Sequence, residues 1–218
     1  MSETGSPIVS ALLDRHGQTF AAELGIDIER NTPSPLFRLL CLAMLTSAPV
    51  QADIAMRGAR AMADAGWTTP DKLAASSWSQ RVEVLNGAGY ARVDEKTATQ
   101  LADFNDTLRS EYDGDLRRLR TAADGDTDTA IKKLTAFKGI GPVGAAIFLR
   151  EAQAAWPEFY PFADKATLKA AGKLGLGDEA ETLSRQVSQS DYVRLVAALV
   201  RVQLANDFDA VREAAGPR

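Results

Sequence analysis

The chain has 218 residues, of which 45% are hydrophobic and 25% are charged, and its net charge is −4. This length can form one or two domains with a sizeable core. No apolar run approaches the roughly 20 residues of a membrane-spanning helix, and a single cysteine, Cys41, excludes an internal disulfide. Residues 1–4 lack the basic and apolar regions of a signal peptide. We therefore expect a cytoplasmic protein that has no membrane partner.

The hydrophobic spacing predicts an all-α protein, because no segment alternates like a strand over a useful length. Ser34 should cap a buried helix that has Pro35 at its first position, and Thr127 or Asp128 should cap the helix after the acidic loop 122–128. That loop lacks the ligand spacing of a calcium site, so no metal is expected. Helices are expected over residues 8–24, 36–45, 53–65, 79–85, 94–108, 116–119 and 191–204, with others starting near Thr69 and Asp164.

Residues 131–153 predict a helix, a tight hairpin and a second helix. Ile131, Leu134 and Phe137 lie three apart on one helix face, and Lys138-Gly139-Ile140-Gly141-Pro142 then breaks the helix. Glycine favours the end of one helix, and proline favours the first position of the next. Free N–H groups around such a hairpin attract anions, and a nucleic-acid phosphate is the natural candidate.

These motifs resemble the helix-hairpin-helix DNA glycosylases, the superfamily of endonuclease III, MutY and AlkA. Gly139-Ile140-Gly141 followed by a helix, with Asp164 downstream at another helix start, is the first match. Pro35-Leu36-Phe37 leading to Leu45-Thr46-Ser47-Ala48 is similar to an early buried helix of the family. Asn86-Gly87-Ala88-Gly89-Tyr90 followed by Lys96 is similar to its Gly-x-Tyr segment. The three matches occur in the family's order.

The resemblance implies a two-lobed all-α fold with the hairpin motif at the cleft between the lobes. One lobe would be the helical bundle of residues 30–156, which includes the motif at 131–153. Both chain ends, 1–29 and 157–218, would form the other lobe. The partner would be double-stranded DNA carrying a damaged or mispaired base, bound by a monomeric, nucleoid-associated enzyme. Asp164 would be the catalytic carboxylate, although a plain helix cap is its alternative reading.

The resemblance also implies the DNA contacts. The expected phosphate-binding residues are Lys138, Gly139, Ile140, Gly141, Pro142, Val143, Gly144 and Lys165. Residues 131–175 hold seven basic and three acidic side chains, a balance of +4 in a chain that is acidic overall. Ordinary solvated helix faces would explain the same excess. Pro49, Gln51 and Tyr90 are expected to contact the lesion or the gap left by the flipped-out base. The alternative is a plain interhelix turn for Pro49 and Gln51, and a core role for Tyr90.

The sequence departs from the family at several positions. Val143 stands where bifunctional relatives carry the lysine that forms a Schiff base, so we expect a monofunctional glycosylase. Many relatives bind an iron–sulfur cluster through four cysteines, and one cysteine cannot supply them, so no cofactor is expected. Pro49 stands where endonuclease III members have a glutamine that enters the gap in the duplex. Gly89 stands where some relatives have a leucine wedge, and Ala166 stands where some have a histidine. His16, the only histidine, is expected to be a surface residue or a cap.

Three functional hypotheses follow. The first is a monofunctional base-excision glycosylase that hydrolyses the N-glycosidic bond of a flipped-out base. The second is a catalytically silent DNA- or lesion-binding protein of the same fold, which the departures at Pro49 and Gly89 favour. The third is a helical interaction module unrelated to DNA. Only the first two require the hairpin glycines for binding.

Overall fold

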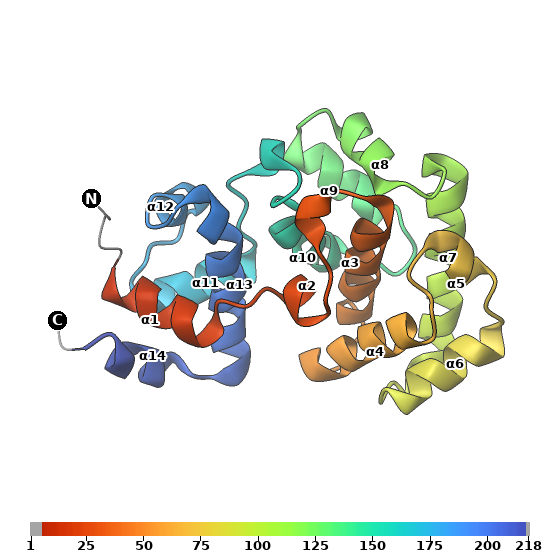
Figure 1. Cartoon of the computed structure of the whole chain (residues 1–218), viewed down its shortest axis with the longest axis horizontal. Coiled ribbons are helices and arrows are strands. Elements are labelled where there is room, and N and C mark those ends of the chain that lie inside the picture. The colour runs from red at the N-terminus through yellow and green to blue at the C-terminus, as the bar shows by residue number, and fades with distance from the viewer. Residues whose placement is uncertain (1–5, 217–218) are drawn as a thin grey trace. The chain divides into compact units, whose positions relative to one another are not determined.

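The computed structural model describes residues 6–216 as fourteen α-helices and two short 3-10 helices, with no strand in that range (Figure 1). The all-α prediction is therefore confirmed. The chain divides into two compact units, each described here by itself: unit 1 is Met1–Glu23 with Leu149–Arg218, and unit 2 is Leu24–Phe148. The lobe boundaries expected near residues 30 and 156 stay a prediction.

Unit 2 is built around one buried helix, α3. Nine of its fourteen residues are buried, from Leu36 to Leu45, because the segment is apolar on nearly every side. The elements of unit 2 are η1 (Ile28–Arg30), α3 (Pro33–Thr46), α4 (Ala52–Asp64), α5 (Pro70–Ala74), α6 (Trp78–Gly87), α7 (Asp94–Tyr112), α8 (Leu116–Ala123), α9 (Thr127–Thr135) and the first part of α10 (Pro142–Ala152). Helices α4, α7 and α8 pack against α3.

Aromatic contacts connect the centre of unit 2 to the end of α9. The Phe37 ring stacks on Phe104 at 6.1 Å between centroids, and Phe104 meets Phe137 edge-on at 6.4 Å. The Tyr112 and Phe137 ring centroids lie 5.8 Å apart. Phe137 and Ile140, on either side of Lys138-Gly139, are both buried. The core thus anchors the segment after α9 at two points, and of the two residues between them Lys138 is exposed.

Unit 1 is organised around α13, whose Leu195, Val196 and Leu199 are fully buried. Its elements are α1 (Pro7–His16), α2 (Phe20–Glu23), the end of α10, η2 (Pro157–Phe159), α11 (Lys165–Leu174), α12 (Ala180–Ser184), α13 (Gln189–Ala205) and α14 (Phe208–Ala214). Helices α1 and α11 pack against α13, and α14 packs against both α1 and α11. The core of unit 1 therefore joins segments from both ends of the chain (Figure 1).

A buried carboxylate fastens the first segment of the chain to α10. The two oxygens of Glu151 accept hydrogen bonds from the N–H groups of Phe20 and Ala21, each at 2.7 Å. Burial raises the pKa of Glu151, and the Arg150 charge and these N–H groups act in the opposite direction. Arg201 donates to Glu23 at 2.6 Å and lies over the Phe20 ring. These contacts order the short helix α2, which has too few residues to be stable alone.

Two expected helix starts and the role of His16 are corrected by the structure. Helix α3 begins at Pro33 after Thr32, and Ser34 instead donates to the Thr68 carbonyl. Asp126 caps α9, accepting from Thr129 N–H at 2.7 Å. His16 is mostly buried, and its Nε2 lies 2.8 Å from an Asp207 oxygen that also accepts from Arg15. Because the pairing with Asp207 spans 191 residues, local sequence could not reveal it.

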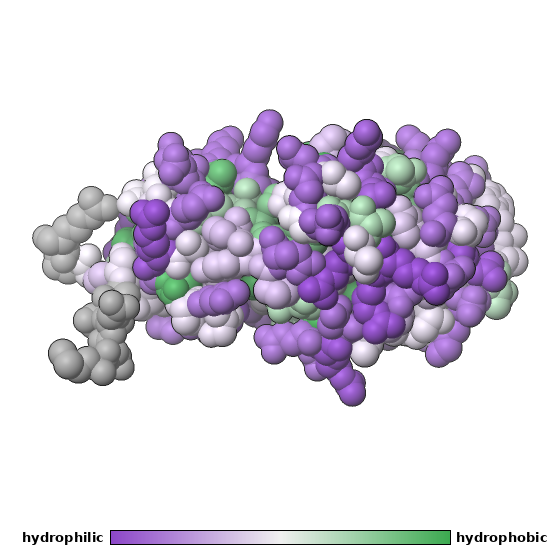
Figure 2. Space-filling model, turned by 90° about the horizontal axis from the view of Figure 1, so that it is seen from above, coloured by the Kyte–Doolittle hydropathy of each residue, from purple (hydrophilic) through white to green (hydrophobic). Residues whose placement is uncertain are grey.

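The face of the chain in Figure 2 is covered mostly by hydrophilic residues. Within residues 6–216, none of the helices combines the length and the apolar character needed to cross a membrane.

Candidate nucleic-acid interface and carboxylate site

The hairpin between α9 and α10 is a turn that requires glycine. The Phe137 carbonyl accepts from Ile140 N–H at 3.1 Å, and Gly139 has a φ of +87°. This is the third turn position, where a type II turn needs positive φ. The first-turn N–H groups of α10 have no acceptor inside the helix. Pro142 and Val143 lie at the surface there, and Val143 has 70% of its surface exposed. The turn thus presents Lys138, Pro142 and Val143 outward.

The two hairpin glycines differ in their surroundings. A Cβ atom on Gly139 would lie 3.2 Å from the Gln100 side chain, in addition to its strained φ. A Cβ on Gly141 would meet nothing within 4 Å, and its φ lies outside the left-handed region. The fold itself therefore needs glycine at position 139. Glycine at 141 leaves open space beside the backbone, which is the room that a closely approaching ligand requires.

A third glycine brings the hairpin against the turn that follows α3. A Cβ on Gly144 would clash with the Ser47 hydroxyl and lie 3.2 Å from the Ala43 carbonyl. The first turn of α10 therefore packs directly against the end of α3. Pro49 and Gln51, two of the expected gap contacts, lie exposed in the turn that follows Ser47. The structure thus brings Gly144 of the hairpin helix beside this turn within unit 2.

Tyr90 is a core residue, which is one of the two roles that the sequence left open for it. Its side chain is fully buried, and its hydroxyl donates to the Leu45 carbonyl at 3.1 Å. A Cβ on Gly58 would lie 2.8 Å from the Tyr90 ring, so α4 also packs closely against it. Burial raises the pKa of the Tyr90 hydroxyl. Tyr90 thus fastens the last turn of α3, just before Pro49 and Gln51.

Asp164 has two partners, one at each carboxylate oxygen. As the cap of α11, its Oδ1 accepts from Thr167 N–H at 2.9 Å. Its Oδ2 accepts from an Arg150 Nη1 at 2.6 Å, and the two side chains are only 9% and 5% exposed. The Nε of Arg150 has no hydrogen-bond partner among the described residues. Asp164 is therefore a helix cap, which was the alternative to a catalytic role. The cap does not exclude catalysis, because each carboxylate oxygen keeps a further lone pair.

Gln153 fixes the loop that leads to Asp164. Its Oε1 accepts from Phe162 N–H and its Nε2 donates to the Phe162 carbonyl, both at 2.9 Å. The Nε2 also donates to the Arg150 carbonyl at 2.8 Å. Arg150 and Gln153 are one helical turn apart, so the end of α10 holds both the loop and the carboxylate. Sequence reasoning missed this pair, although an Arg-Glu step after the apolar run 145–149 was a signal of buried charge.

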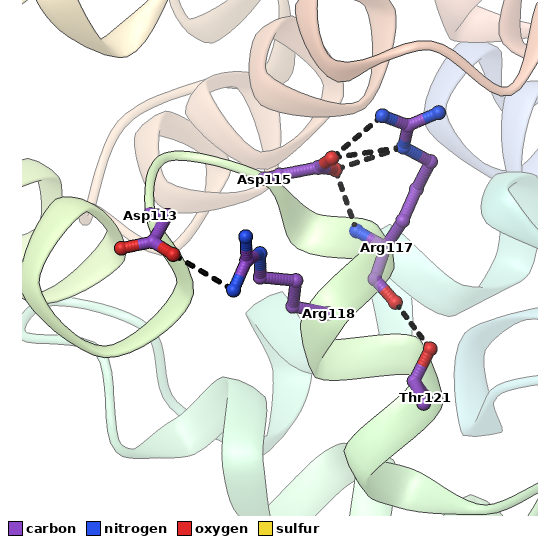
Figure 3. Close-up of polar contacts among 5 residues, drawn as sticks. All are labelled: Asp113, Asp115, Arg117, Arg118 and Thr121. Carbon is purple, nitrogen blue, oxygen red and sulfur yellow. Dashed lines mark hydrogen bonds and ion pairs between the residues drawn. The ribbon is translucent and has the colours of Figure 1, made fainter.

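Exposed lysines close to the hairpin and to Asp164 in the sequence are available to a phosphate. Lys138 is exposed in unit 2, and Lys165 and Lys169 are exposed in unit 1; no ion pair of these three lysines occurs within residues 6–216. Many arginines are instead neutralised locally. In Figure 3, Asp115 accepts from the Arg117 side chain at 2.6 Å and Asp113 pairs with Arg118 at 2.7 Å. The Arg117 hydrogen bonds hold the pKa of Asp115 below its ordinary value.

The residues present do not fit an iron–sulfur cluster. The 218-residue chain has one cysteine, and Cys41 is buried in α3, where desolvation raises the pKa of its thiol. A cluster of this kind needs four thiolate ligands. In the described part of the chain, no three His, Cys, Asp or Glu side chains gather in a way that could hold a metal ion.

Comparison with known proteins supports the fold. Neither a protein-family model nor a curated protein matches the sequence. The H. pylori 3-methyladenine DNA glycosylase MagIII, bound to 1,N6-ethenoadenine, matches with a TM-score of 0.53 and 16% identity, covering 87% of this chain and 99% of that one. A trapped covalent endonuclease III–DNA complex matches with a TM-score of 0.50 and 16% identity, over 77% and 73% of the two chains. A non-covalent endonuclease III–DNA complex matches with a TM-score of 0.50 and 16% identity, covering 77% of this chain and 72% of that one. The resemblance expected from the motifs is thus confirmed for the fold, and this chain has the fold of the helix-hairpin-helix DNA glycosylases.

Proposed function

We propose that this chain is a base-excision DNA glycosylase that hydrolyses the N-glycosidic bond of a flipped-out damaged or mispaired base. The observation that carries the proposal is a nearly buried carboxylate, Asp164, at the start of the helix that follows the hairpin motif. Its partner is double-stranded DNA, and it acts as a monomer. Residues 138–144 and Lys165 bind phosphates, and Pro49 and Gln51 contact the lesion or the gap left by the base.

The chemistry requires a carboxylate of this kind. Breaking the bond between base and sugar develops positive charge on the sugar, as in other glycoside hydrolyses. A fixed carboxylate stabilises that charge and orients or deprotonates the attacking water. The Thr167 N–H and the Arg150 guanidinium hold Asp164 in one orientation. A preorganised group loses little entropy on reaching the transition state, which supports a catalytic reading.

Single-turnover base release from a panel of duplexes, each carrying one lesion, tests the proposal. Each reaction is run with and without alkali, because alkali cleaves the strand at an abasic site. Base release with alkali-dependent cleavage is expected for at least one lesion. Absence of release from every duplex, with tight binding to an abasic-site duplex, would leave the proposal without support.

Val143 underlies the proposal that the enzyme uses water and has no lyase activity. Replacing Val143 by lysine should create a lyase, since the 70% exposed side chain has room for a longer one. The new amine would attack the sugar and form a Schiff base. We expect borohydride to trap a covalent complex with lesion DNA, and nicking to lose its need for alkali. Val143→Met, which adds length without an amine, is the control, and trapping by neither variant would contradict this assignment.

The ion pair of Asp164 favours one alternative, a catalytically silent DNA- or lesion-binding protein of the same fold. Arg150 lies 2.6 Å from the carboxylate and offsets its charge. A carboxylate that is fully offset would stabilise a cation weakly. The lesion panel separates the two functions, because a silent binder would recognise a lesion or abasic duplex and release no base.

Lys138 and Lys165 supply phosphate contacts under either function. Replacing both by alanine should weaken binding at every DNA sequence and reduce the slope of log affinity against log salt by about 2, roughly one unit per lost phosphate contact. Fluorescence anisotropy over a salt series measures this slope. Lys72→Ala, at an exposed lysine on α5, is the matched control and should leave the slope unchanged. An unchanged slope in the double variant would remove these lysines from the interface.

A further inference from the structure

The short helix α2 places a phenylalanine ring next to the arginine that contacts Asp164. The Phe20 ring centroid lies 5.4 Å from the guanidinium carbon of Arg150 and 4.2 Å from that of Arg201. Only 8% of the Phe20 surface is exposed, so the ring is buried. Arg150 in turn donates to Asp164 at 2.6 Å. A ring from the first segment of the chain is thus separated from the carboxylate by a single side chain.

The backbone of Phe20 is fixed by the residue that follows Arg150. Glu151 accepts from the N–H groups of Phe20 and Ala21, each at 2.7 Å. The Arg150-Glu151 pair at the end of α10 therefore contacts two helices at once, because Glu151 binds the start of α2 and Arg150 binds the cap of α11. Phe20 contacts both members of the pair, with its N–H on Glu151 and its ring at Arg150.

The hydrogen bond to Asp164 does not fix the Arg150 guanidinium by itself. This bond leaves from one Nη atom, and the buried Nε has no hydrogen-bond partner within residues 6–216. The Glu151 charge attracts the same guanidinium, but such an attraction has no preferred direction. An aromatic ring within about 6 Å attracts a cation to its negatively charged face, most strongly where water is excluded. The Phe20 ring therefore supplies the restraint that the hydrogen bond lacks.

We propose that Phe20 is a positioning residue of the glycosylase, which keeps Asp164 in its reactive orientation by holding Arg150. The proposal rests on the glycosylase function proposed above. Without the ring, the guanidinium turns about its hydrogen bond, and Asp164 spends time in orientations that stabilise the sugar cation less. A displacement of about 1 Å in a catalytic group can lower a rate by about a hundredfold. The rate of base release should therefore depend on the charge of the ring face, whereas DNA affinity should not.

Difluorophenylalanine in place of Phe20 tests the proposal, because the ring keeps nearly its size while fluorine withdraws negative charge from its faces. The single-turnover rate at saturating enzyme should fall about threefold with this residue and about tenfold in Phe20→Leu, which has no ring. The affinity for an abasic-site duplex should not change. Exchange of the Arg150 Nε–H proton with solvent, followed by NMR, should become faster in both proteins.

Phe208 offers a matched control in the same core. It is 7% exposed, and the Lys173 ammonium lies 4.7 Å from its ring centroid. Lys173 lies at the opposite end of α11 from Asp164. The same two replacements at Phe208 should lower the thermal unfolding midpoint by a similar amount. They should leave the rate and the exchange of the Arg150 proton unchanged.

The two sets of variants separate positioning from packing. Equal loss of rate at Phe20 and Phe208 would mean that packing alone explains the defect, and the proposal would be overturned. An unchanged rate in the difluorophenylalanine protein would overturn it as well, and this protein tests the ring even if Phe20→Leu does not fold. No base release by the wild type, at the level of Asp164→Asn, would instead show that the glycosylase function had failed. Exchange of the Arg150 proton would then still decide whether Phe20 holds Arg150.

Discussion

Asp164→Asn should abolish base release, with a fall of about 10²–10⁴-fold in the single-turnover rate. Asparagine keeps an oxygen that can accept from Thr167 N–H, so the cap of α11 survives, but the negative charge at the sugar is lost. The variant should still bind an abasic-site duplex, because the proposed phosphate-binding residues, 138–144 and Lys165, are unchanged. Single-turnover base release and anisotropy, measured on the same preparation, check the two halves of this expectation.

Stability needs its own control, because Asp164→Asn leaves the buried Arg150 charge unpaired. Removing one partner of a buried pair costs about 3–5 kcal/mol, whereas removing both is often nearly neutral. The double variant Arg150→Met with Asp164→Asn should therefore recover the unfolding midpoint and remain inactive. Asp126→Asn, at an exposed cap that accepts from Thr129 in the same way, should leave activity intact. Recovery of activity in the double variant would mean that misfolding, rather than loss of the carboxylate, had explained the defect.

Gly141→Ala should weaken DNA binding by about 10–100-fold without lowering the thermal unfolding midpoint. A methyl group at this position meets no protein atom within 4 Å, so the fold accepts it. It would, however, fill the space through which a phosphate reaches the backbone N–H groups. A lost charge-assisted hydrogen bond of this kind is worth about 1.5–3 kcal/mol, which gives the expected range. Anisotropy and thermal unfolding measure the two quantities.

Two other glycines make the result interpretable. Gly139→Ala should lower both stability and binding, because its φ of +87° and the nearby Gln100 side chain disfavour any Cβ. Gly172→Ala, in the exposed end of α11 with open space around it, should change neither binding nor the fold adversely. If Gly141→Ala bound DNA like the wild type, the hairpin would not approach phosphate closely.

The sequence predicted the helices well where the hydrophobic spacing was regular and less well at their starts. The apolar run 36–45 could only be a buried helix, and α3 is one. Its start was expected at Pro35 and lies at Pro33, because two prolines suit the first turn equally and tertiary contact gives Ser34 another partner in Thr68. In the same way Asp126, rather than Thr127 or Asp128, caps α9. Neighbouring polar residues compete for a cap, and sequence alone does not rank them.

The candidate site was predictable only where its residues form a continuous motif. The hairpin and Asp164 follow from local sequence and from the resemblance. Arg150 and Gln153 do not, because their roles arise from contacts with Asp164 and Phe162 across a loop of irregular backbone. The burial of Tyr90 depends on Gly58 and Leu45, which lie far from it in the sequence.

The way the chain ends are joined has a consequence for folding during synthesis. Residues 24–148 are contiguous, so they can form their core as soon as they have left the ribosome. Helices α1 and α2 cannot do so, since the Glu151 carboxylate that orders α2 is 131 residues away from Phe20 and the α13 surface that covers α1 is made later still. Helix α1 must therefore wait with its apolar face uncovered while most of the protein is translated. Hydrogen exchange of ribosome-bound chains from which residues 1–148 have emerged should accordingly protect α3 and α7 and leave α1 unprotected.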